Sequence, residues 1–228
     1  MPHRRPAARA ALALVLAAAA TAAHGHGDVA PQPVETGSLP DLGEEWLDEN
    51  PYRSMGREVL EEAVRIGASG FNQNCARCHG LGAVSGGLAP DLRYLSADFD
   101  GDEWFVERFR HGYTQNGITK MPAFGELLGQ KAAWAIRTYI ETRPDNEALE
   151  PHAERLRQIR DELAAGVDDA RAAQLRAELE AIAEQIPTLS GAEYADSPAR
   201  EAALALAEGA AGAHKAAEQL TIGLSASH

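Results

Sequence analysis

The five residues Cys75-Ala76-Arg77-Cys78-His79 decide how this chain folds and what it holds. Two cysteines three positions apart, followed at once by a histidine, are typical of a covalent attachment site for c-type haem. This spacing lets one helical turn present both thiols to one edge of the porphyrin, where each can add to a vinyl group. The imidazole of the next residue then faces the iron. We therefore expect one haem c, with Cys75 and Cys78 as thioether links and His79 as the proximal ligand.

Other uses of the cysteine pair fit the sequence less well. A structural zinc site usually needs four protein ligands, and these two are the only cysteines in the chain. A dithiol redox centre accompanies a βαβ pattern, and the sequence shows no convincing strand. A disulfide across so short a loop would stabilise the fold little.

The N-terminus has the pattern of a secretory signal peptide. Residues 1–23 combine Arg4, Arg5 and Arg9 with an apolar run from Ala10 to Ala20 and small residues after it. The run is too short for a comfortable membrane span, although an uncleaved anchor is an alternative. No other stretch is apolar enough to cross a bilayer. We expect a mature protein without a transmembrane segment, in the periplasm.

The charge is strongly acidic. The 228 residues carry a formal net charge of −13, and without residues 1–23 there are 18 basic side chains against 34 acidic ones, a net charge of −16. Phosphate binding requires a basic face, so nucleic acid is not expected as a partner. Such acidity favours a partner with a positive docking patch, or it serves solubility alone.

Hydrophobic periodicity divides the remaining chain. Residues 24–50 contain several prolines and are expected to be an extended lead-in. A helix is predicted from about Gly56 to the cysteine motif, with a buried face. That face holds Val59, Ala63, Ile66, Gly67 and Phe71. Gly67 is expected to let the last helix of this region cross closely, with Phe71 packing near Ile136 and Tyr139.

Two further helices are predicted before Pro144. Asp102 is expected to cap a helix that Gly112 closes, and Pro144 to stop a helix running from about Glu126 to Arg143. Residues 113–125 between them are expected to be a loop. The region 51–145 is thus predicted to be an all-α domain of three or four helices, in which the haem supplies apolar bulk that so small a core lacks.

A distal iron ligand is predicted at Met121. The mature chain has two methionines, and Met121 lies in the predicted loop before Pro122, whereas Met55 precedes the haem helix. A thioether ligand favours reduced iron and raises the potential. The alternatives are His111, a methionine of the core, or an open distal site.

Other residues are candidates for the haem environment. A ligating histidine normally donates its second ring N–H to a fixed acceptor, and the carbonyl of Pro90 is our candidate acceptor. Arg93, Tyr94 and Trp104 are candidates to hold a haem propionate, or are surface and core residues.

These motifs together resemble the class I cytochromes c. More narrowly, the chain over about residues 27–143 is similar to the periplasmic cytochromes c550 that serve quinoprotein alcohol dehydrogenases. The narrower resemblance is carried by Gly27-Asp28-Val29, Pro31-Gln32-Pro33-Val34, Leu42-Gly43-Glu44-Glu45-Trp46-Leu47, Asn50-Pro51-Tyr52-Arg53 and Phe71-Asn72-Gln73-Asn74 before the motif.

The resemblance implies an electron carrier rather than an enzyme. It implies a pyrroloquinoline-quinone-dependent alcohol dehydrogenase as donor and a terminal oxidase or another cytochrome as acceptor. It also implies His79 and Met121 as axial ligands, and Pro90 as the acceptor for the histidine. The alternatives are a haem enzyme or sensor with an open distal site, and a fixed cytochrome subunit of a respiratory complex.

Residues 146–228 depart from that family. Leucine and isoleucine stripes on either side of Gly166-Val167-Asp168-Asp169 predict a helical hairpin with coiled-coil-like character. Ser197-Pro198 is expected to open an alanine-rich helix to about Leu220. This extension is either a solvated helical appendage or a docking or oligomerisation module.

Overall fold

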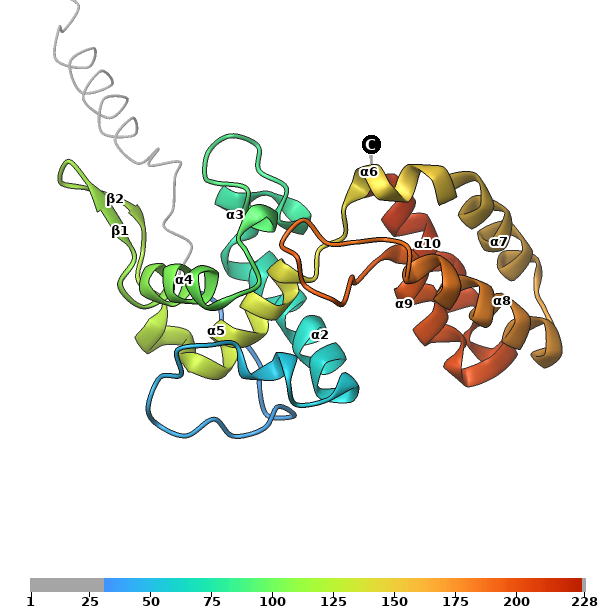
Figure 1. The fold of residues 1–228 in the computed structure, drawn as a ribbon, viewed down its shortest axis with the longest axis horizontal. Coiled ribbons are helices and arrows are strands. Elements are labelled where there is room, and N and C mark those ends of the chain that lie inside the picture. Colours follow the sequence, from blue (N-terminus) through green and yellow to red (C-terminus); the bar gives the residue numbers. More distant parts are fainter. Residues whose placement is uncertain (1–30, 227–228) are drawn as a thin grey trace, which may run out of the picture. The chain divides into compact units, whose positions relative to one another are not determined.

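The computed structural model describes residues 31–226, and these are mainly helical (Figure 1). The predicted signal peptide, residues 1–23, and the Gly27–Val29 phrase lie outside the described residues. The main elements are α2 (Arg57–Asn74), α3 (Ala76–His79), α4 (Phe99–His111), β1 (Tyr113–Gln115), β2 (Ile118–Met121), α5 (Gly125–Glu141), α6 (Asn146–Leu149), α7 (Ala153–Ala165), α8 (Asp169–Ala183), α9 (Pro198–Ala205) and α10 (Ala213–Ala226). Short 3-10 turns cover Pro51–Arg53, Leu81–Ala83, Leu92–Tyr94, Glu150–His152 and Leu206–Gly212.

We call residues 31–145 the haem domain, residues 146–226 the tail, and residues 187–197 within the tail the strap. None of the helices in the described part of the chain is long and apolar enough to cross a membrane.

The haem domain is organised around the crossing of α2 and α5. The crossing is close because Gly67 of α2 has no side chain. A Cβ atom there would lie 1.9 Å from the carbonyl oxygen of Ala135 and 2.8 Å from the Cβ of Tyr139. Beside this contact, the rings of Phe71 and Tyr139 have centroids 5.4 Å apart. The predicted role of Gly67 is confirmed.

Helix α4 begins earlier than the sequence suggested. Its N-cap is Asp98, whose backbone is extended and whose carboxylate accepts a hydrogen bond from Gly101 N at 3.0 Å. The prediction that Asp102 is the cap was wrong, since Asp102 lies inside the helix and is fully buried in an ion-pair network. Gly112, with φ of 71°, does close the helix as predicted.

The predicted loop after α4 contains a short antiparallel hairpin, β1 and β2. Our prediction that the chain has no strand was therefore wrong. The turn residues Asn116 and Gly117 both have positive φ, 52° and 75°. Asn-Gly is the preferred pair for the two-residue hairpin turn that requires this backbone. That dipeptide was the sequence signal for the hairpin.

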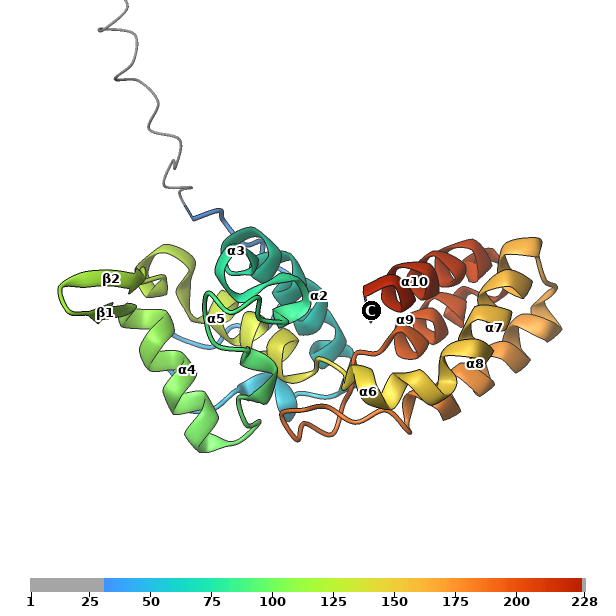
Figure 2. The same cartoon turned by 90° about the horizontal axis from the view of Figure 1, so that it is seen from above.

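The tail is a bundle of helices with its own apolar core (Figure 2). Asp168 caps α8 by accepting from Arg171 N at 2.8 Å, and Arg155 of α7 pairs with Glu178 of α8 at 2.6 Å, an arrangement compatible with the predicted hairpin. The predicted single helix from Ser197 to Leu220 is instead split into α9 and α10. It breaks at Gly209, whose φ of 65° and ψ of −145° do not fit a helix. The core residues of the tail that are fully buried include Leu156, Ile159, Leu175, Leu179 and Leu220.

None of the strap residues belongs to the apolar core of the tail. Tyr194 of the strap instead joins the apolar cluster of the haem domain, which also contains Phe71 and Phe105. The guanidinium of Arg57 lies 4.6 Å from the centre of the Tyr194 ring, and that of Arg200 lies 5.4 Å from it. The strap is therefore built into the haem domain.

Candidate haem site

The cysteine motif forms a helical turn of its own at the end of α2. The carbonyl of Cys75 accepts hydrogen bonds from the backbone N–H groups of Cys78, at 3.1 Å, and His79, at 3.0 Å. Both thiols are free. Cys75 is half-buried and Cys78 is exposed. One turn thus carries both thiols and the histidine, which is the arrangement that attachment to one porphyrin edge needs.

The Cys75 thiol does not have the character of a redox-active dithiol. Burial, with a smaller contribution from Cys78, raises the pKa of Cys75 to about 12. Reactive dithiols have cysteine pKa values lowered by neighbouring positive charge or a helix N-terminus. A lowered pKa of that kind is not found at Cys75.

The imidazole of His79 is held by one of its two nitrogens. Its Nδ1 atom lies 3.0 Å from the carbonyl oxygen of Pro90, which can only accept a hydrogen bond. The proton of a neutral ring therefore belongs on Nδ1, and Nε2 keeps a free lone pair for a metal. This is the second-sphere arrangement common to ligating histidines.

The loop between these two residues is fixed by its own contacts. Gly80, with φ of 81°, passes so close to Val84 that a Cβ atom would lie 1.8 Å from the Val84 carbonyl oxygen. Asp91 accepts from Ser85 N at 3.4 Å and from the Arg93 guanidinium at 2.8 Å and 3.0 Å. Arg93 is thus committed to Asp91 in this structure.

The other propionate candidates differ in their surroundings. Tyr94 is 66% exposed. Trp104 lies on α4 with the guanidinium of Arg108 5.0 Å from the centre of its ring.

Met121 and His111, the two candidates for the distal ligand, differ in burial and in their surroundings. Met121, at the end of β2, is half-buried and borders the apolar cluster that Cys75 also borders. The side chain of His111 is 57% exposed and lies 3.8 Å from Glu107 on the same helix. His111 is therefore the weaker candidate for a distal ligand.

The surroundings of the motif fit a haem. Leu81 and Leu88 in the loop that follows it are each 77% exposed, which is costly unless an apolar surface covers them. No group of three or more His, Cys, Asp or Glu side chains placed to hold a bare metal ion occurs among residues 31–226. Two free thiols, an imidazole with a free Nε2 and exposed apolar loop residues together suit an iron porphyrin better than a bare ion.

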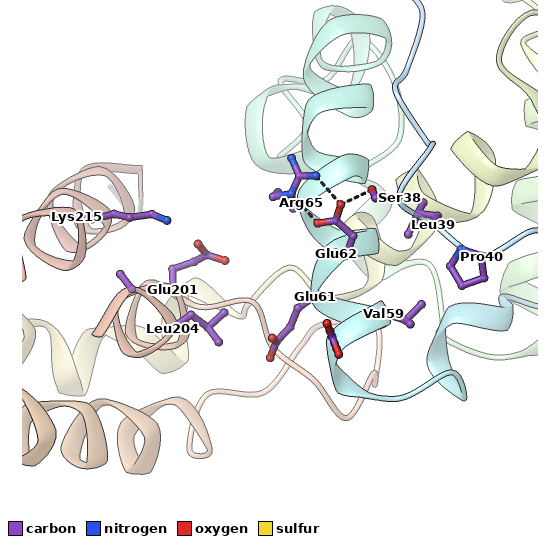
Figure 3. A pocket seen from close by; sticks show the side chains of 12 residues that line it. Ser38, Leu39, Pro40, Val59, Glu61, Glu62, Arg65, Glu201, Leu204 and Lys215 are labelled. Atoms are coloured by element: carbon purple, nitrogen blue, oxygen red, sulfur yellow. Dashed lines mark hydrogen bonds and ion pairs between the residues drawn. The ribbon is translucent and has the colours of Figure 1, made fainter. Parts of the chain in front are cut away.

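A hollow of about 540 Å³ lies away from this site (Figure 3). Its lining includes Glu61 and Glu62 of α2, and Glu201 and Lys215 of the tail, but none of the haem-site candidates. Hydrogen bonds from Arg65, and secondarily from Ser38, lower the pKa of Glu62 to about 2.

Comparison with known proteins gives the family. The chain is 53% identical over 116 residues to cytochrome c550 of Pseudomonas aeruginosa, which covers 51% of this chain and 79% of that protein. The chain belongs to the family of c-type cytochromes that includes cytochrome c550. This cytochrome accordingly binds haem c covalently and is an electron-transfer protein. The family described as cytochrome c oxidase, cbb3-type, subunit III matches its residues 62–140.

More distant relatives share shorter segments with this cytochrome. Quinohemoprotein alcohol dehydrogenase ADH IIB of Pseudomonas putida is 32% identical over 93 residues, covering 40% of this chain and 13% of that enzyme. The cbb3-type cytochrome c oxidase subunit FixP of Rhizobium meliloti is 28% identical over 127 residues, covering 49% of this chain and 39% of that subunit. No solved structure matches this cytochrome.

Proposed function

We propose that this cytochrome accepts electrons from a pyrroloquinoline-quinone-dependent alcohol dehydrogenase in the periplasm and passes them to a terminal oxidase or another cytochrome. The identity of 53% to cytochrome c550 carries the proposal. The matches to segments of two quinohemoprotein alcohol dehydrogenases support it, because a domain similar to this chain is built into enzymes of that name.

In this proposal, Cys75 and Cys78 are the thioether links, and His79 and Met121 are the axial ligands. When bound, haem c supplies one iron that takes up and returns a single electron. The Pro90 carbonyl keeps the Nδ1 proton of His79 in place, at 3.0 Å. Trp104, Tyr94 and Arg93 remain the candidates beside the propionates, with Arg93 held to Asp91 at 2.8 Å.

A filled distal site suits electron transfer rather than catalysis at iron. If His79 and Met121 both bind the iron, the haem would have no position left for a peroxide or a gas. Met121, half-buried and at the edge of the same cluster as Cys75, supports this choice over a haem enzyme or sensor with an open distal site.

The test is electron transfer from the dehydrogenase to the full-length oxidised cytochrome. The dehydrogenase is reduced with its alcohol, the two are mixed rapidly, and haem reduction is followed by absorbance. We expect a second-order reaction that slows as salt is added, because a net charge of −16 without residues 1–23 attracts a positive docking patch that ions screen. Reduction no faster than by an unrelated dehydrogenase would refute the donor.

A second candidate is the electron-transfer subunit of an oxidase. The family match over residues 62–140 and the FixP relatives favour it. Stable copurification with a cbb3-type oxidase in detergent, with no reduction by the dehydrogenase, is the result this candidate requires.

A further inference from the structure

The strap is joined to the haem domain by backbone hydrogen bonds at three places. Asp145 N donates to Pro187 O at 2.8 Å, and Asp196 N donates to Thr142 O at 2.8 Å. These two fix the ends of the strap to the chain that follows α5. The third bond lies in the middle of the strap, where Ala97 N, just before α4, donates to Ser190 O at 2.9 Å.

Ser190 joins three segments at once. It is 7% exposed. Its hydroxyl donates to the carbonyl of Glu141 at the end of α5 and accepts from Ala192 N at 3.1 Å. Its own carbonyl accepts from Ala97. Without the hydroxyl, both the hydrogen bond to the Glu141 carbonyl and the one from Ala192 N are lost.

Ala97 ends a segment that begins at Pro90, and that segment is held along its length. Leu92 is buried and Leu95 packs against the same apolar cluster, which fixes the middle of the segment. Arg137 donates to the carbonyls of Leu95, at 3.4 Å, and Ser96. The end of the segment is thus held both by Arg137 and by the Ser190 carbonyl. Ser190 therefore holds the C-terminal end of a segment whose other end carries the Pro90 carbonyl.

We propose that Ser190 is a positioning residue for the proximal side of the haem. Through the strap, it holds the segment from Pro90 to Ala97 and so keeps the Pro90 carbonyl on Nδ1 of His79. That carbonyl makes the imidazole a stronger donor to iron, which favours the oxidised state. The tail thereby sets a property of the haem as well as adding a helical bundle. The inference rests on the proposed role of His79 as proximal ligand.

The test uses the full-length holoprotein with Ser190→Ala, and measures the midpoint potential together with hydrogen exchange of the amides of residues 92–97. We expect Ser190→Ala to raise the potential and to speed exchange along the whole segment. Ser190→Thr, which keeps the hydroxyl, should restore both. The matched control is Thr221→Ala, which removes a hydroxyl that donates to Ala217 O at 2.8 Å inside α10 and should change neither.

An unchanged potential in Ser190→Ala would overturn the proposal, even with faster exchange at Ala97 and Ala192. If Ser190→Ala yields no holoprotein, Ser190→Cys gives the same comparison, because a thiol of similar size donates only weakly. The ligand assignment is checked separately by His79→Ala. A parental haem spectrum in that variant would refute the role of His79, which is a different failure from an unchanged potential in Ser190→Ala.

Discussion

Asp102 of α4 and Arg137 of α5 form an ion pair in which both side chains are fully buried. Arg137 Nε lies 2.8 Å from Asp102 Oδ1. Arg53 adds a second pair to Asp102 at 2.7 Å, and the backbone N–H of Asn50 donates to the same carboxylate at 2.8 Å. The network ties the lead-in to two helices of the haem domain.

Removing the Asp102 carboxylate should be strongly destabilising. Asp102→Ala leaves the Arg137 guanidinium buried without its main partner, and breaking a buried pair on one side costs about 3–5 kcal/mol. Urea unfolding of the holoprotein measures the loss. Asp98→Ala is the control, since loss of that helix cap should cost only about 1 kcal/mol. Equal costs for the two substitutions would contradict the buried network.

A side chain at Gly67, where α2 and α5 cross, should lower the stability of the haem domain. Gly67→Ala puts a Cβ atom 1.9 Å from the Ala135 carbonyl oxygen, so α2 and α5 must separate. Overpacking of this kind typically costs about 1–3 kcal/mol or more. Gly37→Ala is the matched control, because no atom lies within 4 Å of a Cβ there. Thermal unfolding should show a lower midpoint for Gly67→Ala alone.

The distal ligand is tested by Met121→His. The absorption band in the red that reports a thioether on ferric iron should vanish, and the midpoint potential should fall, because imidazole favours the oxidised state more than a thioether does. Met55→His is the control, since Met55 is 39% exposed and lies before α2. A parental spectrum in Met121→His would reject the assignment.

We expect the stability of the tail to depend on pH through Glu201. Burial, and then the neighbouring Asp196, raise the pKa of Glu201 to about 8 from an ordinary value of 4.5, against opposing effects of Arg143 and Lys215. One oxygen of buried Asp196 has no other hydrogen-bond partner, and a protonated Glu201 can donate to it. The folded state therefore holds a proton that the unfolded state has released between these two pH values.

Because the folded state holds this proton, the stability of the protein should fall as the pH rises. The contribution of Glu201 to stability is fully present below pH 4.5 and is lost as the pH rises through about 8. The slope is at most about 1.4 kcal/mol per pH unit. Glu201→Gln, which stays neutral and can still donate, should flatten the pH dependence of unfolding measured across that range. Glu208→Gln, an exposed acid of the same tail, should leave it unchanged.

The sequence predicted the helices of the haem domain well where a local signal set them. The backbone geometry of Gly112 and Pro144 ends the helices that precede them. Gly67 is recognisable as the small residue on an apolar helix face. The Asn116-Gly117 turn has an equally local signal, but residues 113–125 were expected to be a loop without strands. The prediction that Asp102 is the helix cap failed for another reason, because Asp98 and Asp102 are both good caps by residue type. Only the distant partners Arg53 and Arg137 distinguish a cap from a buried ion.

For the candidate site, five consecutive residues determined the cofactor, because thioether attachment needs two thiols and a ligand at fixed local spacing. The Pro90 carbonyl, the candidate acceptor expected from the sequence, lies 3.0 Å from His79 Nδ1. The strap could not be foreseen. Ser190 and Ala97 are 93 positions apart, and their hydrogen bond depends on how two folded regions meet. Local chemistry thus set the haem motif in the sequence, whereas the packing of remote segments, which only the tertiary structure decides, joined the tail to the haem domain.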